Sequence, residues 1–276
     1  MMIGQHTVLY AVLGRPIAHS LSPAAHNAAF SAARINAVYL AFETADAEGA
    51  LRAMRCLNLR GASITIPLKS AVVPFLDEID PVAQSIGAVN TIVNENGLLR
   101  GFNTDATAAL GALQQRSPVA GKRCAIIGAG GAARAVGFAL KQADADLTIV
   151  NRSPGRGREL ARALESPFIP LDRLGGLKAD ILVQTTPVGM FPRVDRSPVP
   201  EHILHRGMVV MDIIYNPVQT RLLREAGKKG CITLSGMDMF ILQAGEQFRL
   251  WTGVDPPLGV MDQAVKGALE RQYEKD

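Results

Sequence analysis

Three small residues in the middle of the chain are spaced for phosphate binding. Gly128, Gly130 and Ala133 come directly after the apolar run 123–127 and begin an alanine-rich segment that continues to about residue 142. In such a strand–turn–helix context, the first glycine permits a tight turn and the second lets a pyrophosphate approach the backbone. The amides at the helix N-terminus then face the anion. An ordinary glycine-rich turn is the weaker alternative. The predicted cofactor-binding residues of this turn are Gly128, Ala129, Gly130, Gly131 and Ala132.

The residues after the next strand predict which dinucleotide binds. An NAD site usually places an acidic residue about 20 positions after the glycines, where it accepts a hydrogen bond from the ribose 2′-hydroxyl. Here the strand 147–150 is followed by no acid but by Asn151, Arg152, Ser153 and Arg156. Guanidinium groups bind phosphate through paired donors, so we predict NADP, with Arg152 and Arg156 on its 2′-phosphate. Asn151 and Ser153 would be their polar neighbours. A solvated basic loop is the alternative, and the missing acid counts against it.

Six polar residues of the first hundred or so positions lie where predicted strands end, which is where α/β proteins place ligands. They are Ser20, Ser22, Thr65, Lys69, Asn90 and Asp105. The two serine hydroxyls suit a carboxylate, although Ser22 could equally cap the helix that Pro23 begins. A lone lysine is more often solvated, Asn90 could be a turn residue, and Asp105 could be a first-turn helix acid. Spacing alone does not unite the six residues in one site.

The elements that must position these residues alternate along the chain. In the first part, strands are expected at 7–13, 38–42, 62–66, 88–93 and 98–101, and helices at 22–33, 47–57 and 104–115. In the second part, strands are expected at 123–127, 147–150, 181–185, 209–214 and 232–234, and helices at 158–164 and 221–228. An alanine-rich helix that ends at about residue 142 is expected after the glycine turn. Helical patterns fill the end of the chain from residue 237. Such alternation predicts mainly parallel sheets covered by helices.

Composition limits the classes of protein that the chain can represent. It has 276 residues, of which 48% are hydrophobic and 20% charged, and a formal net charge of +4. These values exclude a disordered chain, and without a basic run they favour a small anionic ligand over nucleic acid. Cys56, Cys124 and Cys231 form no disulfide framework, and the histidines have no metal-ligand spacing. We expect a cytoplasmic protein without metal, membrane or nucleic-acid partners, either a monomer or a homodimer.

Several motifs together resemble the shikimate dehydrogenase family. The opening motif is Gly14-x-Pro16-Ile17-x-His19-Ser20-x-Ser22-Pro23-x-x-His26-Asn27. It is followed, in the family's order, by Thr65–Lys69, Gly87–Thr91, Gly101–Asp105, Asn151-Arg152, Tyr215–Pro217 and Gly236-x-x-Met239-x-x-x-Gln243. The resemblance covers nearly the whole chain, from residue 14 to about 253.

The resemblance implies a two-domain α/β fold and a reaction. An αβα substrate-binding domain with a mainly parallel sheet is expected over 1–106, completed by C-terminal helices at 240–276. A Rossmann-type NADP domain is expected over 107–239, with the active site in the cleft between the domains. The family reduces 3-dehydroshikimate to shikimate with NADPH, in the route to chorismate and the aromatic amino acids.

The resemblance also implies roles for single residues. Ser20, Ser22 and Tyr215 would hold the substrate carboxylate. The ring hydroxyls and the reacting oxygen would be held by Thr65, Lys69, Asn90, Asp105 and Gln243. On the cofactor side, Gly236 and Met239 would approach the nicotinamide, and Thr186 lies in the segment expected beside it.

The resemblance also implies two catalytic residues. Two positions of this sequence depart from the family's commonest pattern. Lys69 is the expected general acid for the developing alkoxide, and Asp105 is expected to orient its ammonium. Ser63 stands where the family often has Asn near the substrate. Gln184 stands where Asn often begins the segment that contains Thr186.

Two other functions are open to a chain with these motifs. One is a quinate/shikimate dehydrogenase of the same family that uses NAD, which Arg152 disfavours. The other is a non-catalytic sensor of pathway metabolites, which would be expected to lack Lys69 or Asp105 or to carry an appended DNA-binding segment.

Overall fold

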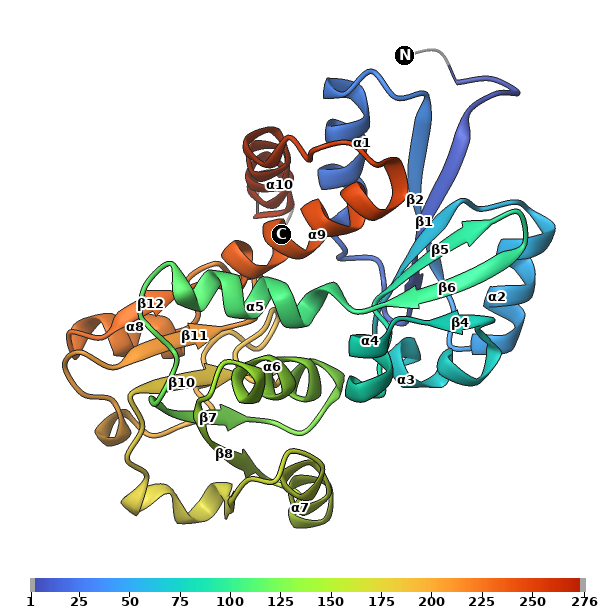
Figure 1. The fold of residues 1–276 in the computed structure, drawn as a ribbon. Helices are drawn as coiled ribbons and strands as arrows, with labels where there is room; N and C mark the ends of the chain where they lie inside the picture. The colour runs from blue at the N-terminus through green and yellow to red at the C-terminus, as the bar shows by residue number, and fades with distance from the viewer. Residues whose placement is uncertain (1–2, 274–276) are drawn as a thin grey trace. The chain divides into compact units, whose positions relative to one another are not determined.

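The protein is described by a computed structural model that covers residues 3–273 and divides into two compact units (Figure 1). Among the described residues, the first unit contains 3–104 and 241–273, and the second contains 105–240. Within residues 3–273, no helix has the length and apolar character needed to cross a membrane.

A six-stranded sheet forms the centre of the first unit. Its strands are β1 (Val8–Gly14), β2 (Ala37–Glu43), β3 (Gly61–Ile64), β4 (Glu78–Ile79), β5 (Thr91–Glu95) and β6 (Leu98–Phe102), in the order β2-β1-β3-β5-β6-β4. β1 runs parallel to β2 and β3, β4 runs parallel to β6, and β5 alone is antiparallel to its neighbours. The prediction of a mainly parallel sheet is therefore confirmed.

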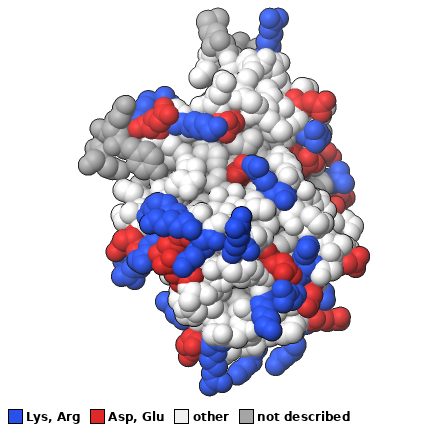
Figure 2. Space-filling model, turned by 90° about the vertical axis from the view of Figure 1, so that its left-hand side faces the viewer, with Lys and Arg blue, Asp and Glu red and all other residues white. Residues whose placement is uncertain are grey.

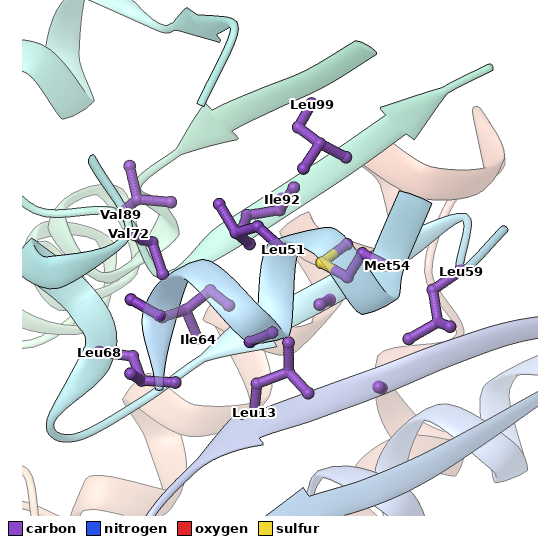
Figure 3. Packing of buried hydrophobic residues seen from close by; sticks show 14 of the residues in the cluster. Leu13, Leu51, Met54, Leu59, Ile64, Leu68, Val72, Val89, Ile92 and Leu99 are labelled. Carbon is purple, nitrogen blue, oxygen red and sulfur yellow. The ribbon is translucent and has the colours of Figure 1, made fainter. Parts of the chain in front are cut away.

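Helices cover both faces of this sheet. They are α1 (Ser22–Ala32), α2 (Ala47–Cys56), α3 (Leu68–Ala71), α4 (Pro81–Ile86), α10 (Leu258–Tyr273) and the part of α9 (Gly236–Thr252) that follows residue 240. Figure 3 shows Leu51 and Met54 of α2 packed over Ile64, Ile92 and Leu99. All five are at most 2% exposed, and each such side chain contributes about 1.5–3 kcal/mol through burial.

The other face of the sheet is covered by α1, α9 and α10. The ring of Phe30 on α1 lies 5.0 Å from the ring of Tyr10 on β1 and 5.5 Å from that of Phe248 on α9. α10 packs along α1 (Figure 1). The C-terminal helices therefore complete the hydrophobic core of the first unit.

The second unit contains an all-parallel sheet. Its strands are β7 (Arg123–Ile127), β8 (Asp146–Asn151), β9 (Phe168–Pro170), β10 (Ile181–Gln184), β11 (Val209–Asp212) and β12 (Ile232–Leu234), in the order β12-β11-β10-β7-β8-β9. This is the strand order of the doubly wound dinucleotide-binding fold. The order reverses between β7 and β10, and ligands of such folds bind at the carboxyl ends of the strands at that point.

The helices of the second unit pack on both faces of its sheet. They are α5 (Thr104–Gln114), which begins at the boundary between the units, α6 (Gly131–Gln142), α7 (Pro154–Ala163) and α8 (Arg221–Lys228). Leu222 and Leu223 of α8 pack against Leu182 and Val210 on one face. On the other face, a Cβ atom at Gly137 of α6 would lie 2.5 Å from Leu164 Cδ1 and 3.4 Å from Ile126 Cδ1, so a larger side chain there would require these side chains to move.

The start of one helix and the N-cap residue of another differ from the prediction. α7 begins at Pro154 and not at residue 158, because Pro occupies the first helical turn, where its missing N–H costs nothing. Arg156 therefore lies in the first turn of a helix and not in a loop. Ser22 is not the N-cap of α1, since Leu21 occupies that position without a side-chain hydrogen bond. The Ser22 side chain is instead buried and bonded elsewhere in the unit, as described below.

The surface has no uniform charge on the face drawn in Figure 2. Among the described residues on that face, Lys and Arg side chains are interspersed with Asp and Glu side chains. Several charges of the chain form ion pairs, such as Arg123 with Asp180 at 2.7 Å.

Candidate active site

The glycine turn lies where the sequence predicts it, at the carboxyl end of β7. Gly128 has a φ of +127°, and its amide donates a hydrogen bond of 2.8 Å to the carbonyl of Val150 on β8. A Cβ atom at residue 128 would overlap the Thr185 hydroxyl and lie 3.1 Å from Thr186 Cγ2. Glycine is therefore required on two grounds, the backbone conformation and the close approach of the β10 end.

Gly130 is free of such crowding. It is the N-cap of α6, in an extended conformation with φ −95° and ψ −173°, and a Cβ atom there would meet no heavy atom within 4 Å. Ala129, Gly131 and Ala132 are half-buried, whereas Ala133 is buried against the unit. The backbone amides of this helix N-terminus can thus be approached by an anion, and the turn fits the pyrophosphate of a dinucleotide.

Gln184 organises the neighbouring turn at the end of β10. The side chain is fully buried, and its Oε1 accepts from the amide of Thr186 at 3.0 Å. Its Nε2 donates to the carbonyls of Thr186 and Val188, both at 3.1 Å. Glutamine at this position therefore closes the turn that carries Thr186, beside Gly128 at the point where the strand order reverses.

The end of β8 presents cationic and polar groups. Asn151 ends the strand and donates from Nδ2 to the carbonyl of Ser153 at 3.0 Å. Ser153 is the N-cap of α7 and makes no side-chain capping bond. Arg152, Ser153 and Arg156 are exposed. Two guanidinium groups at a helix N-terminus, with no acid at the strand end, fit a phosphorylated ribose better than a free 2′-hydroxyl.

A buried carboxylate fixes the loop that carries Tyr215. Asp212 ends β11 and is fully buried; its Oδ1 accepts from the amide of Ile214 at 3.1 Å and its Oδ2 from the Thr220 hydroxyl at 2.7 Å. Burial raises the pKa of Asp212 to about 7. Burial also raises the pKa of Tyr215, whose ring lies 5.0 Å from that of Phe240. Asp212 is not among the site residues predicted from the sequence, although it stands only three residues before Tyr215.

Gly236 and Met239 lie in the first turn of α9. The amide of Gly236 donates to the carbonyl of Ile214 at 3.2 Å, and a Cβ atom there would overlap the carbonyl of Ile213. Met239 is buried. The start of α9 is thus held directly against the Tyr215 loop.

In the first unit, the two serines lie together at the start of α1. The amide of Ser22 donates to Ser20 Oγ at 3.3 Å. Ser22 is 7% exposed and its side chain is a hydrogen-bond partner of the buried Tyr39, whose pKa is raised by burial. The pair thus has one half-buried and one buried hydroxyl.

Thr65, Lys69 and Asn90 are brought together by backbone hydrogen bonds. The amide of Ile64, next to Thr65, donates to the carbonyl of Asn90 at 2.7 Å. The carbonyl of Lys69 accepts from the amide of Val89, next to Asn90, at 2.8 Å. The end of β3 and the start of α3 therefore lie beside the residues that lead into β5, as the prediction of one site requires.

Asn90 connects this group to α5 and α9. Its Oδ1 accepts from the amide of Thr104 at 2.8 Å, and its Nδ2 donates to the Thr104 hydroxyl at 3.0 Å. The same hydroxyl donates to the carbonyl of Gln243 at 3.2 Å. Asp105 is the next residue, buried in the first turn of α5 and the first residue of the second unit. Its pairing with Lys69 stays a prediction.

Three family models, all of shikimate dehydrogenase domains, match successive parts of the chain. Residues 12–92 match a family model for the shikimate dehydrogenase substrate-binding domain, residues 111–217 one for shikimate/quinate 5-dehydrogenase, and residues 236–266 one for the shikimate 5′-dehydrogenase C-terminal domain. The NADP⁺-dependent shikimate dehydrogenase of Moorella thermoacetica is 46% identical over 277 residues, which cover 95% of this chain and 94% of the relative.

Solved structures of related enzymes superimpose closely. Shikimate 5-dehydrogenase from Thermus thermophilus, in complex with NADP(H) and shikimate, matches with a TM-score of 0.88 and 39% identity, over 95% of this chain and all of the other (100%). Quinate dehydrogenase from Corynebacterium glutamicum, in complex with NAD, matches with a TM-score of 0.88 and 30% identity, over 95% of this chain and 99% of the other.

Proposed function

The chain belongs to the shikimate dehydrogenase family, and we propose from this that it reduces 3-dehydroshikimate reversibly to shikimate with NADPH. The observation that carries the choice of cofactor is the end of β8, where Arg152 and Arg156 stand exposed and no acidic residue follows the strand. An acid there would repel the 2′-phosphate of NADP, whereas guanidinium groups donate paired hydrogen bonds to it.

The cofactor would be held by the second unit. The backbone from Gly128 to Ala132 would bind its pyrophosphate, with Asn151 and Ser153 beside the arginines at the ribose. Thr186, Gly236 and Met239 would line the nicotinamide. The close approach of Gly128 to Thr185 supports this, because it brings backbone together at the ends of β7 and β10, where the strand order reverses. Gly236 approaches Ile213 in the same way after β12 and β11.

The substrate would be held by hydroxyl, amide and ammonium groups. Ser20, Ser22 and Tyr215 would bind its carboxylate. Its ring oxygens would be bound by Thr65, Lys69, Asn90, Asp105 and Gln243. The hydrogen bonds that join Thr104 to Asn90 and Gln243 support a single binding surface for these oxygens.

Lys69 and Asp105 would carry out the proton transfer. When bound, NADPH supplies a hydride to the carbonyl carbon, so negative charge develops on the carbonyl oxygen. The ammonium of Lys69 stabilises this charge and donates the proton that completes the hydroxyl group. Asp105 orients the ammonium, and in the reverse reaction a neutral Lys69 takes the proton back. Such general acid–base help contributes about 10²- to 10⁴-fold in rate.

A four-way assay tests the function. Purified protein is mixed with shikimate or quinate and with NADP⁺ or NAD⁺, and reduced cofactor is followed by absorbance. We expect kcat/KM to be highest by far for shikimate with NADP⁺. Higher kcat/KM for quinate with NAD⁺ would identify the alternative dehydrogenase, and shikimate binding without turnover would identify a sensor. The oligomeric state, a monomer or a homodimer, and a cytoplasmic location remain part of the proposal.

A further inference from the structure

A series of buried hydrogen bonds, here called the line, connects Tyr39 on β2 through Gln247 on α9 to Asn90 in the first unit. The Tyr39 hydroxyl donates to Ser63 Oγ at 2.6 Å, and Ser63 donates to Gln247 Oε1 on α9 at 2.8 Å. Gln247 Nε2 then donates to Thr91 Oγ1 at 2.9 Å and to the carbonyl of Asn90 at 3.2 Å. These five residues are at most 6% exposed.

The Gln247 amide is used at both ends. Its oxygen accepts from Ser63 and lies 3.3 Å from His26 Nε2. Its nitrogen donates one hydrogen to Thr91 Oγ1 and the other to the carbonyl of Asn90. An amide with two donors and one carbonyl oxygen satisfied in this way has one orientation only. Because the surroundings are buried, each of these bonds is stronger than the same bond in water.

The line ends on groups that we assign to the substrate. Thr91 Oγ1, which accepts from Gln247, donates to Asn90 Oδ1 at 2.7 Å. The Asn90 side-chain oxygen is thereby identified as the acceptor, which fixes the direction in which the Asn90 amide faces. At the other end, Tyr39 is a hydrogen-bond partner of the Ser22 side chain. Gln247 therefore lies between the carboxylate-binding and the hydroxyl-binding ends of the proposed site.

We propose that Gln247 is a positioning residue for substrate binding, which orients Asn90 through Thr91 and through the Asn90 carbonyl. The proposal rests on the proposed function, since it assumes that Asn90 binds shikimate. No contact of Gln247 with the substrate is required. A residue that acts in this way affects the affinity for shikimate and leaves the affinity for NADP⁺ unchanged.

Gln247→Met tests the proposal, because methionine has a similar length but no amide donors or acceptor. We expect the KM for shikimate to rise about 10-fold, with the KM for NADP⁺ within about twofold of wild type. Phe248→Leu is the matched control, since Phe248 is the next residue of α9, fully buried and outside the hydrogen-bonded line. It should lower the melting temperature and leave both KM values unchanged.

Thr91→Val provides a second variant that keeps the shape of the side chain and suits a strand. It removes only the hydroxyl between Gln247 and Asn90, and it should raise the KM for shikimate several-fold. A double-mutant cycle of Gln247→Met with Asn90→Ala should be strongly non-additive, because the first change acts through Asn90.

The outcomes separate two kinds of failure. Additive effects in the cycle, or an unchanged KM for shikimate in both Gln247→Met and Thr91→Val, would overturn the positioning role. A Gln247→Met protein in which the KM for NADP⁺ rises as much as the KM for shikimate would also overturn the positioning role. A wild-type protein that does not oxidise shikimate with NADP⁺ would contradict the proposed function itself, and with it the assumption made here.

Discussion

The hydroxyl of Thr220 donates a 2.7 Å hydrogen bond to the carboxylate of Asp212, which is fully buried at the end of β11. Thr220 is also the N-cap of α8, where its side chain accepts from the amide of Leu223. The carboxylate thus ties the start of the Tyr215 loop to the helix that follows it.

Asp212→Asn should change how stability depends on pH. The folded pKa of Asp212 is about 7, above the usual 3.8, so the folded state keeps a proton that the unfolded chain releases. The contribution of this group to stability is therefore present below pH 4 and is lost as pH rises to about 7, by at most ~1.4 kcal/mol per pH unit. Urea unfolding between pH 4 and 8 should show this loss in wild type relative to Asp212→Asn. The exposed Asp172→Asn serves as control and should track wild type.

His26→Phe should reduce the loss of folding stability that occurs as the pH falls. His26 is fully buried, stacked 4.5 Å from the ring of Tyr39, and burial lowers its pKa to about 3 from 6.5. The unfolded chain therefore binds a proton that the folded state excludes, and stability that is complete above pH 6.5 is lost as pH falls towards 3. The variant should lose less stability over this range than wild type, with a slope smaller by up to ~1.4 kcal/mol per pH unit.

Denaturant unfolding between pH 4 and 7 measures this difference. The exposed His6→Gln is the control and should show the wild-type slope. Equal slopes in wild type and His26→Phe would mean that His26 does not resist protonation in the folded protein.

Local patterns predicted part of this molecule, and contacts between distant residues explain the rest. The turn at Gly128 and the strand-end arginines lie within about 30 consecutive residues, so strand, turn and helix preferences all point to one structure. Gln247 has no such local pattern. Its partner Ser63 is 184 residues away in sequence, and only the path of α9 brings the two together. The signal available in the sequence was a glutamine within the largely apolar segment that forms α9.

Some local preferences misled the prediction. Ser22 before Pro23 has the pattern of an N-cap, yet Leu21 occupies the N-cap position and the Ser22 side chain is buried in the unit. The strand expected from residue 88 begins only at Thr91, and the preceding Asn90 bonds to Thr104 through its side chain. The very short strands β4 and β9 had no pattern long enough to detect.

Gly130→Ala should reduce cofactor binding without reducing stability. The φ of −95° is open to alanine, and the added Cβ would meet no protein atom within 4 Å. The methyl group would instead occupy the place where we expect the pyrophosphate to approach the backbone. We expect the melting temperature to stay within about 2 °C of wild type while the KM for NADP⁺ rises at least about 10-fold, and the KM for shikimate should change little.

Gly175→Ala is the matched control, because an added Cβ there also meets no protein atom. It should leave both KM values unchanged. A Gly130→Ala protein with wild-type NADP⁺ affinity would place the pyrophosphate elsewhere.

Arg152→Ala should weaken NADPH binding selectively. Loss of a charged hydrogen bond to the 2′-phosphate costs about 1.5–3 kcal/mol, which corresponds to a rise in the KM for NADPH of about 10- to 160-fold. Weak activity with NADH should be nearly unchanged, because NADH lacks that phosphate. Arg158→Ala is the control on the same helix, where the guanidinium lies over the ring of Phe168 at 5.9 Å. Equal losses with both cofactors in Arg152→Ala would refute the phosphate contact.

Lys69→Ala should slow the chemical step more than it weakens binding. Lys69 is half-buried at the start of α3, where its carbonyl is tied to the amide of Val89 and thereby placed beside Asn90. Without its ammonium, the developing alkoxide has no general acid, so kcat should fall about 10²- to 10⁴-fold while the KM for shikimate changes much less. Steady-state kinetics with shikimate and NADP⁺ measure both parameters, and the exposed Lys178→Ala should match wild type. An unchanged kcat in Lys69→Ala would remove this lysine from the proton transfer, and the assignment of Asp105 as its orienting partner would then have no basis.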